Sequence, residues 1–198
     1  MTDIQQDGRA RRQQDIFDLN RTKLIDTAVD VINEVGDIRE VTLTQIAKEA
    51  GVSPATAYNH FPDRMEDVFS AIVHARMDVA ANMGATLADE SLSVIEKLKQ
   101  IPVTYAENLV SLGYAGKVIV VQMFNLVNVN KWLDQDPVQA IAALLSNSDQ
   151  YHDRADEIAV NMATAFRGAM FEYALNIGDH ELFNLSLIHI SEPSRHRL

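Results

Sequence analysis

The residues of this chain that offer chemistry are suited to nucleic-acid contact. The stretch GVSPATAYNHF, Gly51 to Phe61, places short polar and methyl-bearing side chains directly after a glycine turn. Ser53 and Thr56 can hydrogen-bond to bases or phosphates, and Ala55 can touch a thymine methyl group, as can Thr56. Asn59 can pair with adenine. These side chains fit the groove of DNA if one helix presents them together.

Catalytic and metal-binding patterns do not accompany this stretch. The chain has no cysteine, and its six histidines are scattered without an HExxH or paired ExxH spacing. A glycine-rich phosphate loop and a GxSxG motif are also missing from the sequence. We therefore expect no enzyme activity, no catalytic residue, no metal and no cofactor.

Composition favours a folded, soluble protein. Hydrophobic residues make up 47% of 198 residues, which is enough for a packed core. The N-terminal residues have no apolar segment of the signal-peptide kind, and no apolar run reaches the roughly 20 residues of a membrane-spanning helix. We expect a cytoplasmic protein without a membrane partner. The formal charge of -11 argues against indiscriminate nucleic-acid binding, so contact with DNA must be local.

Apolar periodicity predicts an all-α fold, because no long window alternates with period two. Pro102 and Pro137 are expected to kink or interrupt their helices. We predict helices at about 15–35, 44–50, 53–60, 63–83, 91–112, 115–129, 131–146 and 153–176.

Start and stop signals are clearest between residues 36 and 66. Thr42 is a predicted N-cap with Gln45 three residues later, and Gly36 and Gly51 are predicted helix stops. Ser53 then caps a second short helix with Pro54 at its first position, and Asp63 opens a long helix. Two short helices joined by a glycine turn indicate a helix-turn-helix, although three helices that simply pack together would look similar.

The longer string VTLTQIAKEAGVSPATAYNHFPDRMEDVF, Val41 to Phe69, resembles the signature of the TetR family of bacterial regulators. The shared features are a threonine, then IA, AGVS, a tyrosine, HF and a basic residue at the start of the next helix. The resemblance implies a three-helix DNA-binding domain followed by a larger helical domain for ligand binding and dimerisation. Ala55 and Ala57 depart from the family pattern, which usually has glycine and a larger apolar residue there.

The resemblance also implies roles for individual residues. Thr42, Thr44 and Arg64 would hold phosphates, and Tyr58 would reach the DNA backbone. Facing DNA along the recognition helix would be Ser53, Ala55, Thr56, Tyr58 and His60. Packing remains an alternative role for Tyr58 and His60, and solvent exposure is one for Asn59.

Positive charge near this segment is sparse. Residues 1 to 64 hold 8 Lys and Arg against 11 Asp and Glu. Lys48 and Arg64 bracket the recognition helix, and Arg9, Arg11 and Arg12 form a basic arm ahead of the first helix, unless that arm is only a solvated terminus. Because one copy makes few contacts, we expect a homodimer on a palindromic operator.

The second half of the chain suggests a dimer interface and a ligand pocket. The helix at about 153–176 is apolar on two sides, so one side is expected to face a symmetry mate. That side contains Ala155, Ala159, Ala163, Met170 and Ala174. Candidates for binding a small-molecule effector, each of which can also be plain core, are Tyr105, Asn108, Met123, Phe124, Trp132, Met162, Phe166 and Arg167.

The predicted organisation is a DNA-binding domain over residues 1–62 and a ligand-binding and dimerisation domain over 63–185, connected by the helix at 63–84. Residues 186–198 break the pattern, and we expect a non-native or disordered tail. The predicted function is a ligand-responsive transcriptional repressor that a small molecule releases from DNA. The alternative is a helical ligand-binding or protein-interaction module without DNA binding.

Overall fold

The computed structural model describes residues 3–77, 79–125 and 137–175 of the chain. All regular elements in these ranges are helices, as the periodicity predicts. The chain divides into two compact units, Met1–Ala75 and Arg76–Leu198. This division falls inside a helix and not at residue 62, where the sequence pattern places the end of the first domain.

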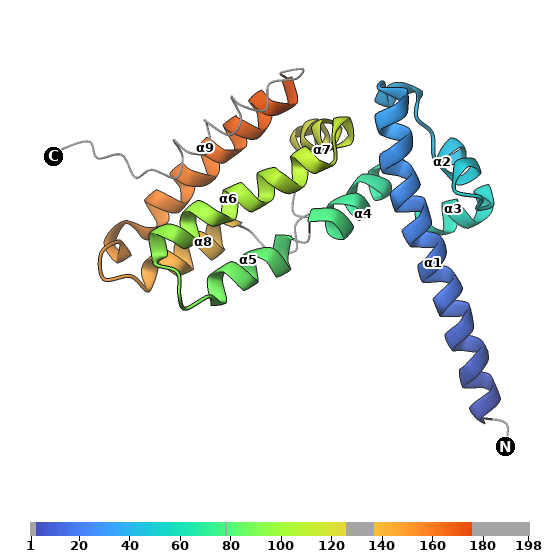
Figure 1. Ribbon diagram of the computed structural model, residues 1–198, viewed down its shortest axis with the longest axis horizontal. Coiled ribbons are helices and arrows are strands. Elements are labelled where there is room, and N and C mark those ends of the chain that lie inside the picture. Colours follow the sequence, from blue (N-terminus) through green and yellow to red (C-terminus); the bar gives the residue numbers. More distant parts are fainter. Residues whose placement is uncertain (1–2, 78, 126–136, 176–198) are drawn as a thin grey trace. The chain divides into compact units, whose positions relative to one another are not determined.

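The first unit consists of one long helix and the shorter helices that follow it (Figure 1). Its core contains large apolar side chains such as Leu24, Ile32, Ile46, Phe61 and Ile72, all fully buried. Helix α1 packs against both α2 and α3. The elements are α1 (Asp3–Val35), the 3-10 helix η1 (Ile38–Glu40), α2 (Leu43–Glu49), α3 (Pro54–His60) and most of α4 (Met65–Met77).

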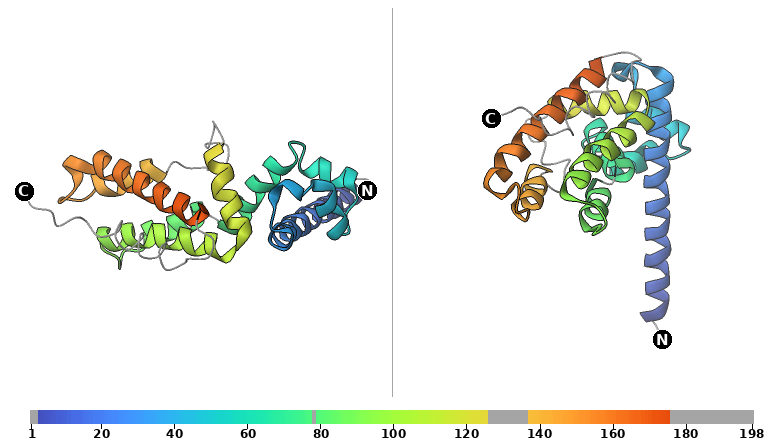
Figure 2. Two further views of the ribbon diagram at one scale, coloured as in Figure 1. Left: turned by 90° about the horizontal axis from the view of Figure 1, so that it is seen from above. Right: turned by 60° about the vertical axis from the view of Figure 1, so that its left-hand side comes forward.

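Helix α1 begins earlier than the sequence pattern predicts. The predicted start is near residue 15, whereas the helix runs from Asp3. The first turns consist mostly of polar residues, which give no apolar periodicity from which a helix could be predicted. Both Figure 1 and the right-hand view of Figure 2 show this N-terminal part extending past α2 and α3. At the other end, Gly36 adopts a φ of 69°, the left-handed conformation predicted for the helix stop.

The second unit is a bundle in which α9 packs against α7 and α8, and α6 packs against α5, α7 and α8. One buried cluster joins α6, α8 and α9 through Leu98, Ile141, Leu145, Ala155 and Ala159. The helices are α5 (Val79–Ala88), α6 (Val94–Ser111), α7 (Tyr114–Asn125), α8 (Pro137–Ser146) and α9 (Ala155–Leu175), with the 3-10 helix η3 (His152–Arg154) before α9.

Two helix predictions for this region differ from the structure. Helix α4 starts at Met65 and not at residue 63. Helix α6 continues through Pro102, so this proline does not interrupt it. The helix predicted at 63–83 crosses residue 78, and the helix predicted from 131 begins within 126–136, and these positions lie outside the described residues. The described helices after them are α5 from Val79 and α8 from Pro137.

Candidate nucleic-acid interface and ligand pocket

The turn between α2 and α3 is built by its own backbone and capping groups. The N–H of Val52 donates to the Ala47 carbonyl at 2.9 Å, and the N–H of Gly51 donates to the Lys48 carbonyl at 3.2 Å. This pair of bonds is a Schellman motif, and it needs the φ of 67° that Gly51 adopts. The turn between α2 and α3 is therefore closed by backbone hydrogen bonds.

Both predicted N-caps are confirmed. The Thr42 hydroxyl accepts a hydrogen bond from the Gln45 N–H at 3.2 Å, which caps α2. The Ser53 hydroxyl accepts from the Thr56 N–H at 3.1 Å and lies 2.8 Å from the Thr56 hydroxyl. Pro54 follows as the first helical residue of α3. The start of α3 is thus specified locally, and Thr56 is half-buried against its cap.

Helix α3 presents one face to solvent and buries the other. Ala55, Tyr58 and Asn59 are exposed, whereas Ala57 and His60 are buried. At 100° per residue, this pattern separates the two sets around the helix axis. The exposed set consists of small, hydroxyl and amide side chains, which are the types that can reach base edges and phosphates in a groove.

His60 belongs to the buried set, so its predicted place on the DNA-facing side is wrong. Its side chain is only 6% exposed, and its ring centroid lies 3.9 Å from that of Phe17 on α1. Neither ring nitrogen has a hydrogen-bond partner among the described residues. Burial lowers the pKa of the His60 imidazole, and the nearby Arg21 guanidinium lowers it further. His60 therefore joins α3 to α1 as a neutral packing residue.

Three polar residues from separate elements meet at the exposed side of α3. The Tyr58 hydroxyl lies 3.4 Å from the Thr44 hydroxyl on α2. The Arg64 guanidinium lies over the Tyr58 ring, with its carbon 6.0 Å from the ring centroid. Tyr58 is 39% exposed, and Thr44 and Arg64 are exposed as well. We call Thr44, Tyr58 and Arg64 the phosphate triad, because each carries a hydrogen-bond donor of the kind that binds phosphate oxygens.

The backbone at Arg64 is unusual. Its φ of 58° is the only positive value among non-glycine residues in the described part of the chain. The Cβ makes this conformation costly for a residue such as arginine, while glycine adopts it freely. The Arg64 N–H donates to the Phe61 carbonyl, and the Arg64 carbonyl accepts from the Val68 N–H at the start of α4. An arginine at a position that favours glycine points to a role for its guanidinium group.

The other predicted DNA contacts are also accessible. Thr42 and Ser53 are exposed at the starts of α2 and α3, and Lys48 is exposed in the last turn of α2. The arginines of the predicted arm are exposed too, but they lie within α1 and not on an extended segment before it. Those residues are Arg9, Arg11 and Arg12.

Comparison with protein families identifies this unit. Residues 24–72 match the family model described as "Bacterial regulatory proteins, tetR family". The first unit is similar to the TetR family over these residues. The matched residues run from the buried half of α1 through the Schellman turn and the phosphate triad to the middle of α4.

Relatives of known name agree with this assignment. The chain is 35% identical over 69 residues to the HTH-type transcriptional regulator BetI of Brucella anthropi, covering 35% of each chain. It is 36% identical over 78 residues to BetI of Klebsiella pneumoniae, covering 38% of this chain and 40% of that protein. The alignments therefore span little more than a third of these relatives' length.

A solved structure shares the fold over a longer range. The structure of SmeT in complex with triclosan covers 87% of this chain and 90% of its own chain, with a TM-score of 0.62. At 16% identity, this similarity shows a common fold. The second unit shares its helix arrangement with this structure.

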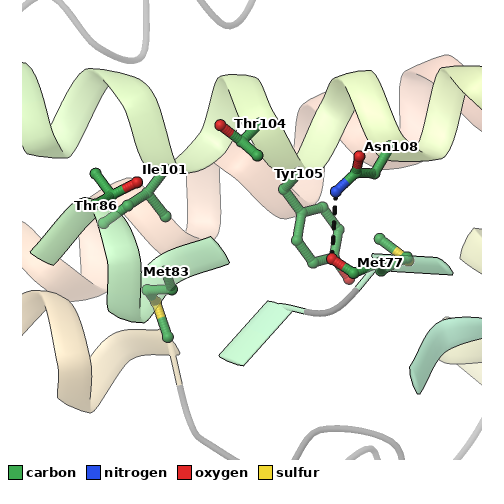
Figure 3. Close-up of a pocket in the computed structure, with 7 residues that line it drawn as sticks. All are labelled: Met77, Met83, Thr86, Ile101, Thr104, Tyr105 and Asn108. Carbon is green, nitrogen blue, oxygen red and sulfur yellow. Dashed lines mark hydrogen bonds between the residues drawn. The ribbon is translucent and has the colours of Figure 1, made fainter. Parts of the chain in front are cut away.

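The second unit contains a small cavity between the end of α4, α5 and α6. Its volume is about 20 Å³, which is room for roughly one water molecule. None of the described side chains that line it carries a formal charge. Figure 3 shows these residues, which are Met77, Met83, Thr86, Ile101, Thr104, Tyr105 and Asn108.

Two polar residues of this cavity are among the predicted ligand contacts. The Asn108 amide donates to the Met77 carbonyl at 3.2 Å, as the dashed line in Figure 3 marks. The Tyr105 hydroxyl donates to the Met123 sulfur at 4.0 Å, and burial raises the pKa of this phenol. Phe166 packs edge-on against the Tyr105 ring with centroids 5.3 Å apart. Tyr105 thus brings three of the predicted residues together.

The remaining ligand candidates lie elsewhere or outside the described part. Met162 packs against the core cluster of α6, α8 and α9, and Arg167 is exposed on α9. The side chain of Phe124 and all of Trp132 lie outside the described residues. Sequence reasoning missed Met77, Met83 and the other lining residues, because nothing in an apolar helix pattern tells a cavity wall from solid core.

The small-residue stripe predicted for dimerisation faces the inside of the unit. Ala155, Ala159, Ala163 and Met170 are buried, and Ala174 is half-buried. Their small size lets α9 approach α8 and α7 within one chain, so the pattern is explained without a partner. The opposite side of α9 carries exposed apolar residues, including Val160 at 52% and Leu175 at 57% exposure.

Membrane spans and metal clusters are absent from the described residues. No described helix is long and apolar enough to cross a membrane. No group of three or more His, Cys, Asp or Glu side chains within the described ranges is placed to hold a metal ion.

Proposed function

We propose that the protein is a DNA-binding transcriptional regulator that reads the major groove with α3. Ala55, Thr56 and Asn59 would contact base edges, and the phosphate triad would hold the adjacent backbone. The observation that carries this proposal is the convergence of the triad from α2, α3 and the start of α4 beside an exposed helix face. The regulators named BetI, which align with this unit, support it.

The acidic composition is compatible with this role. Binding affinity depends on local neutralisation of phosphates, and Lys48, Arg64 and the arginines on α1 are all exposed. Because few cations are available, the DNA-binding constant should depend only weakly on salt. The logarithm of this constant falls with the logarithm of the salt concentration with a slope of about −0.9 for each phosphate neutralised. Most of the specificity must then come from the small side chains of α3.

A homodimer on a palindromic operator follows from the small number of contacts in one copy. Two recognition helices would occupy half-sites roughly 34–36 Å apart. The exposed apolar side of α9, with Val160 and Leu175, is the surface we assign to the second copy, in place of the buried alanine stripe. An apolar helix side of this kind gains stability when a partner covers it.

We propose that a small molecule regulates this binding from the cavity in the second unit. SmeT, which shares the fold, forms a complex with triclosan, and triclosan is therefore a suitable first probe for this chain. The expected outcome is repression that the effector relieves. The protein would act by binding in the cytoplasm, and no step of this mechanism requires catalysis.

Selection of bound sequences from a random pool of double-stranded DNA tests the proposal. A palindromic sequence should be enriched, and the complex should contain two protein chains by light scattering. Asn59→Ala should change the enriched bases, because it removes a base contact, whereas Arg64→Ala should weaken binding to all sequences alike. If no sequence is enriched by the full chain, a helical binding module without DNA contact is the better interpretation.

A further inference from the structure

We propose that Phe17 and Arg21 of α1 are positioning residues for DNA recognition, which fix the direction in which α3 meets the groove. This inference rests on the proposed function, because it names residues that act on the same interface from behind it. The two residues are four positions apart, so they lie one turn apart on the same side of α1. We call them the α1 pair. Both precede residue 24, where the match to the family model begins.

Arg21 contacts the last residue of α3 and the residue that follows it. Its guanidinium Nη1 donates to the His60 carbonyl at 3.2 Å, across 39 positions of sequence. The guanidinium carbon lies 5.0 Å from the centroid of the Phe61 ring. Phe61 is fully buried, and Arg21 is half-buried. A guanidinium held by both a hydrogen bond and a ring contact is restricted in position and in orientation.

Phe17 contacts the same end of α3 from the preceding turn of α1. Its ring centroid lies 3.9 Å from that of the His60 imidazole, with 42° between the ring planes. The His60 side chain is buried at this contact, although neither ring nitrogen has a hydrogen-bond partner among the described residues. Burial of an imidazole without such partners costs free energy, which packing must offset. The α1 pair thus covers His60 by its ring and holds it by its carbonyl.

Helix α3 depends on contacts of this kind because it is short. It has seven residues, about two turns, and a helix of this length is not stable by itself. Its N-terminal end is joined to α2 through the hydrogen-bonded turn at Gly51. The α1 pair holds the opposite end. Contacts at both ends define the direction of the helix axis, and with it the direction of the exposed side.

The end that the α1 pair holds is adjacent to residues with proposed DNA contacts. Asn59, which would contact a base, directly precedes His60 in the chain. The Phe61 carbonyl accepts the Arg64 N–H at 3.0 Å, next to the phosphate triad. Because hydrogen bonds need donor–acceptor distances of about 2.7–3.2 Å, a displacement of α3 by about 1 Å would remove the base contact of Asn59. The long side chain of Arg64 can still follow a phosphate, so base recognition should suffer more than phosphate binding.

Two matched pairs of variants test this role. Arg21→Met removes the charge and the donor and keeps a long side chain, whereas Lys23→Met removes the same charge from an exposed position on the same helix. Phe17→Ala removes the ring, and Leu19→Ala shortens an α1 side chain that is 54% exposed. Affinity is measured for the operator enriched from the random pool and for a random duplex of equal length. The temperature is one at which circular dichroism shows every variant folded.

Arg21→Met should lower the ratio of operator affinity to random-duplex affinity about 10-fold or more, because a base contact is misplaced in both chains of a dimer. Phe17→Ala should lower this ratio about 3- to 10-fold, and both control variants should leave it unchanged. Arg21→Lys keeps the charge and a donor and should recover most of the ratio. A residue that only stabilises the fold would not change this ratio while the protein is folded.

Hydrogen exchange reports on the same contact without DNA. The Phe61 N–H donates to the Ala57 carbonyl at 2.9 Å in the last turn of α3. Its exchange should become about 5-fold faster in Arg21→Met and in Phe17→Ala, and remain unchanged in Lys23→Met and Leu19→Ala. If Arg21→Met does not fold, Phe17→Ala and Arg21→Gln provide the test. Unchanged exchange in the variants of both α1-pair residues would refute a hold on α3.

Salt dependence separates positioning from a direct phosphate contact of Arg21. If Arg21 bound a phosphate, Arg21→Met would weaken operator and random duplex alike and would reduce the salt slope by about 0.9 for each chain. That result, or an unchanged affinity ratio in Arg21→Met and Phe17→Ala, would overturn this inference and leave the proposed function intact. A wild-type chain that prefers no DNA sequence would instead overturn the proposed function, and this inference with it.

Discussion

The two units of this protein present their functional residues in different ways. In the first unit the phosphate triad and the exposed side of α3 lie on short helices that begin and end at strong local signals. In the second unit the cavity is formed by residues from three helices, and although α6 begins at a capping box of Ser93 and Glu96, no cap or turn marks the lining positions themselves. Local caps and glycine turns therefore allow the recognition helix to be predicted from the sequence. The cavity depends on packing between segments that are distant in the chain.

Similarity to other proteins divides along the same line. The family model and the BetI relatives align with the region around the recognition helix, whereas the second unit is matched only through the fold of SmeT at 16% identity. Contact with a regular polyanion needs particular donors at particular places. A helix bundle needs only apolar side chains that fill its volume, and many sequences satisfy that requirement.

Substitution of Arg64 has the largest expected effect and tests the proposed DNA contact of the first unit. Arg64→Glu should lower operator affinity by about 100-fold or more in a dimer, because two charge-assisted phosphate contacts are lost. Arg64→Gly should also bind DNA weakly but should be as stable as wild type or more so, since glycine adopts the φ of 58° without strain. Operator titration and urea unfolding separate these effects. A lower free energy of unfolding in Arg64→Gly than in the wild type would contradict the view that Arg64 adopts a strained backbone conformation for the sake of a DNA contact.

Gly116 offers the corresponding test in the second unit. A Cβ at this position would collide with the Leu109 backbone carbonyl, where α7 approaches the end of α6. Gly116→Ala should therefore reduce the free energy of unfolding by about 1–3 kcal/mol. Gly84→Ala on α5 is the matched control, because its Cβ meets nothing within 4 Å. That variant should gain about 0.5–1 kcal/mol from helix propensity, and a loss of similar size in both would refute the close approach.

His60 should make the first unit sensitive to mild acid. Burial lowers the pKa of its imidazole from 6.5, so the folded state binds the proton less readily than the unfolded chain. The stability that depends on neutral His60 is then fully present above pH 6.5 and is lost as the pH falls from there through the lowered pKa. Arg21 strengthens this effect and Asp18 opposes it.

His60→Phe is the variant that isolates this dependence. It removes two unpartnered nitrogens while keeping a ring against Phe17, so stability at neutral pH should be equal or higher. The measurement is urea unfolding between about pH 5 and 7.5, on either side of the ordinary histidine pKa. Equal slopes against pH in this variant and the wild type would show that another group titrates in this range.

Tyr58→Phe should give the smallest change. The substitution removes one hydroxyl, which lies 3.4 Å from that of Thr44, and keeps the ring under Arg64. Operator affinity should fall about 3- to 10-fold, with unfolding free energy unchanged. Thr44→Val should have an effect of similar size on DNA binding. A loss of stability in Tyr58→Phe would indicate that the hydroxyl serves packing between α2 and α3 and not the DNA backbone.

Sequence reasoning succeeded where a feature depends on a few neighbouring residues. Thr42, Ser53, Gly36 and Gly51 have the predicted capping or turn roles because each one acts on backbone groups close to it in the chain. It failed where one face of a helix could contact either the rest of the chain or an outside partner. The alanine stripe of α9 and the ring of His60 are buried within the chain, and periodicity cannot tell an internal partner from DNA or a second copy.

By itself, the sequence determined that the protein is all-helical, where the recognition helix starts, and which family it resembles. Only the tertiary structure decided that Thr44, Tyr58 and Arg64 meet, and that Asn108 ties α6 to the end of α4. The physical reason is the distance along the chain between the residues that interact. Caps and glycine turns are settled by bonds within one or two helical turns, whereas a cavity or a triad exists only when separate helices pack at one distance and one angle.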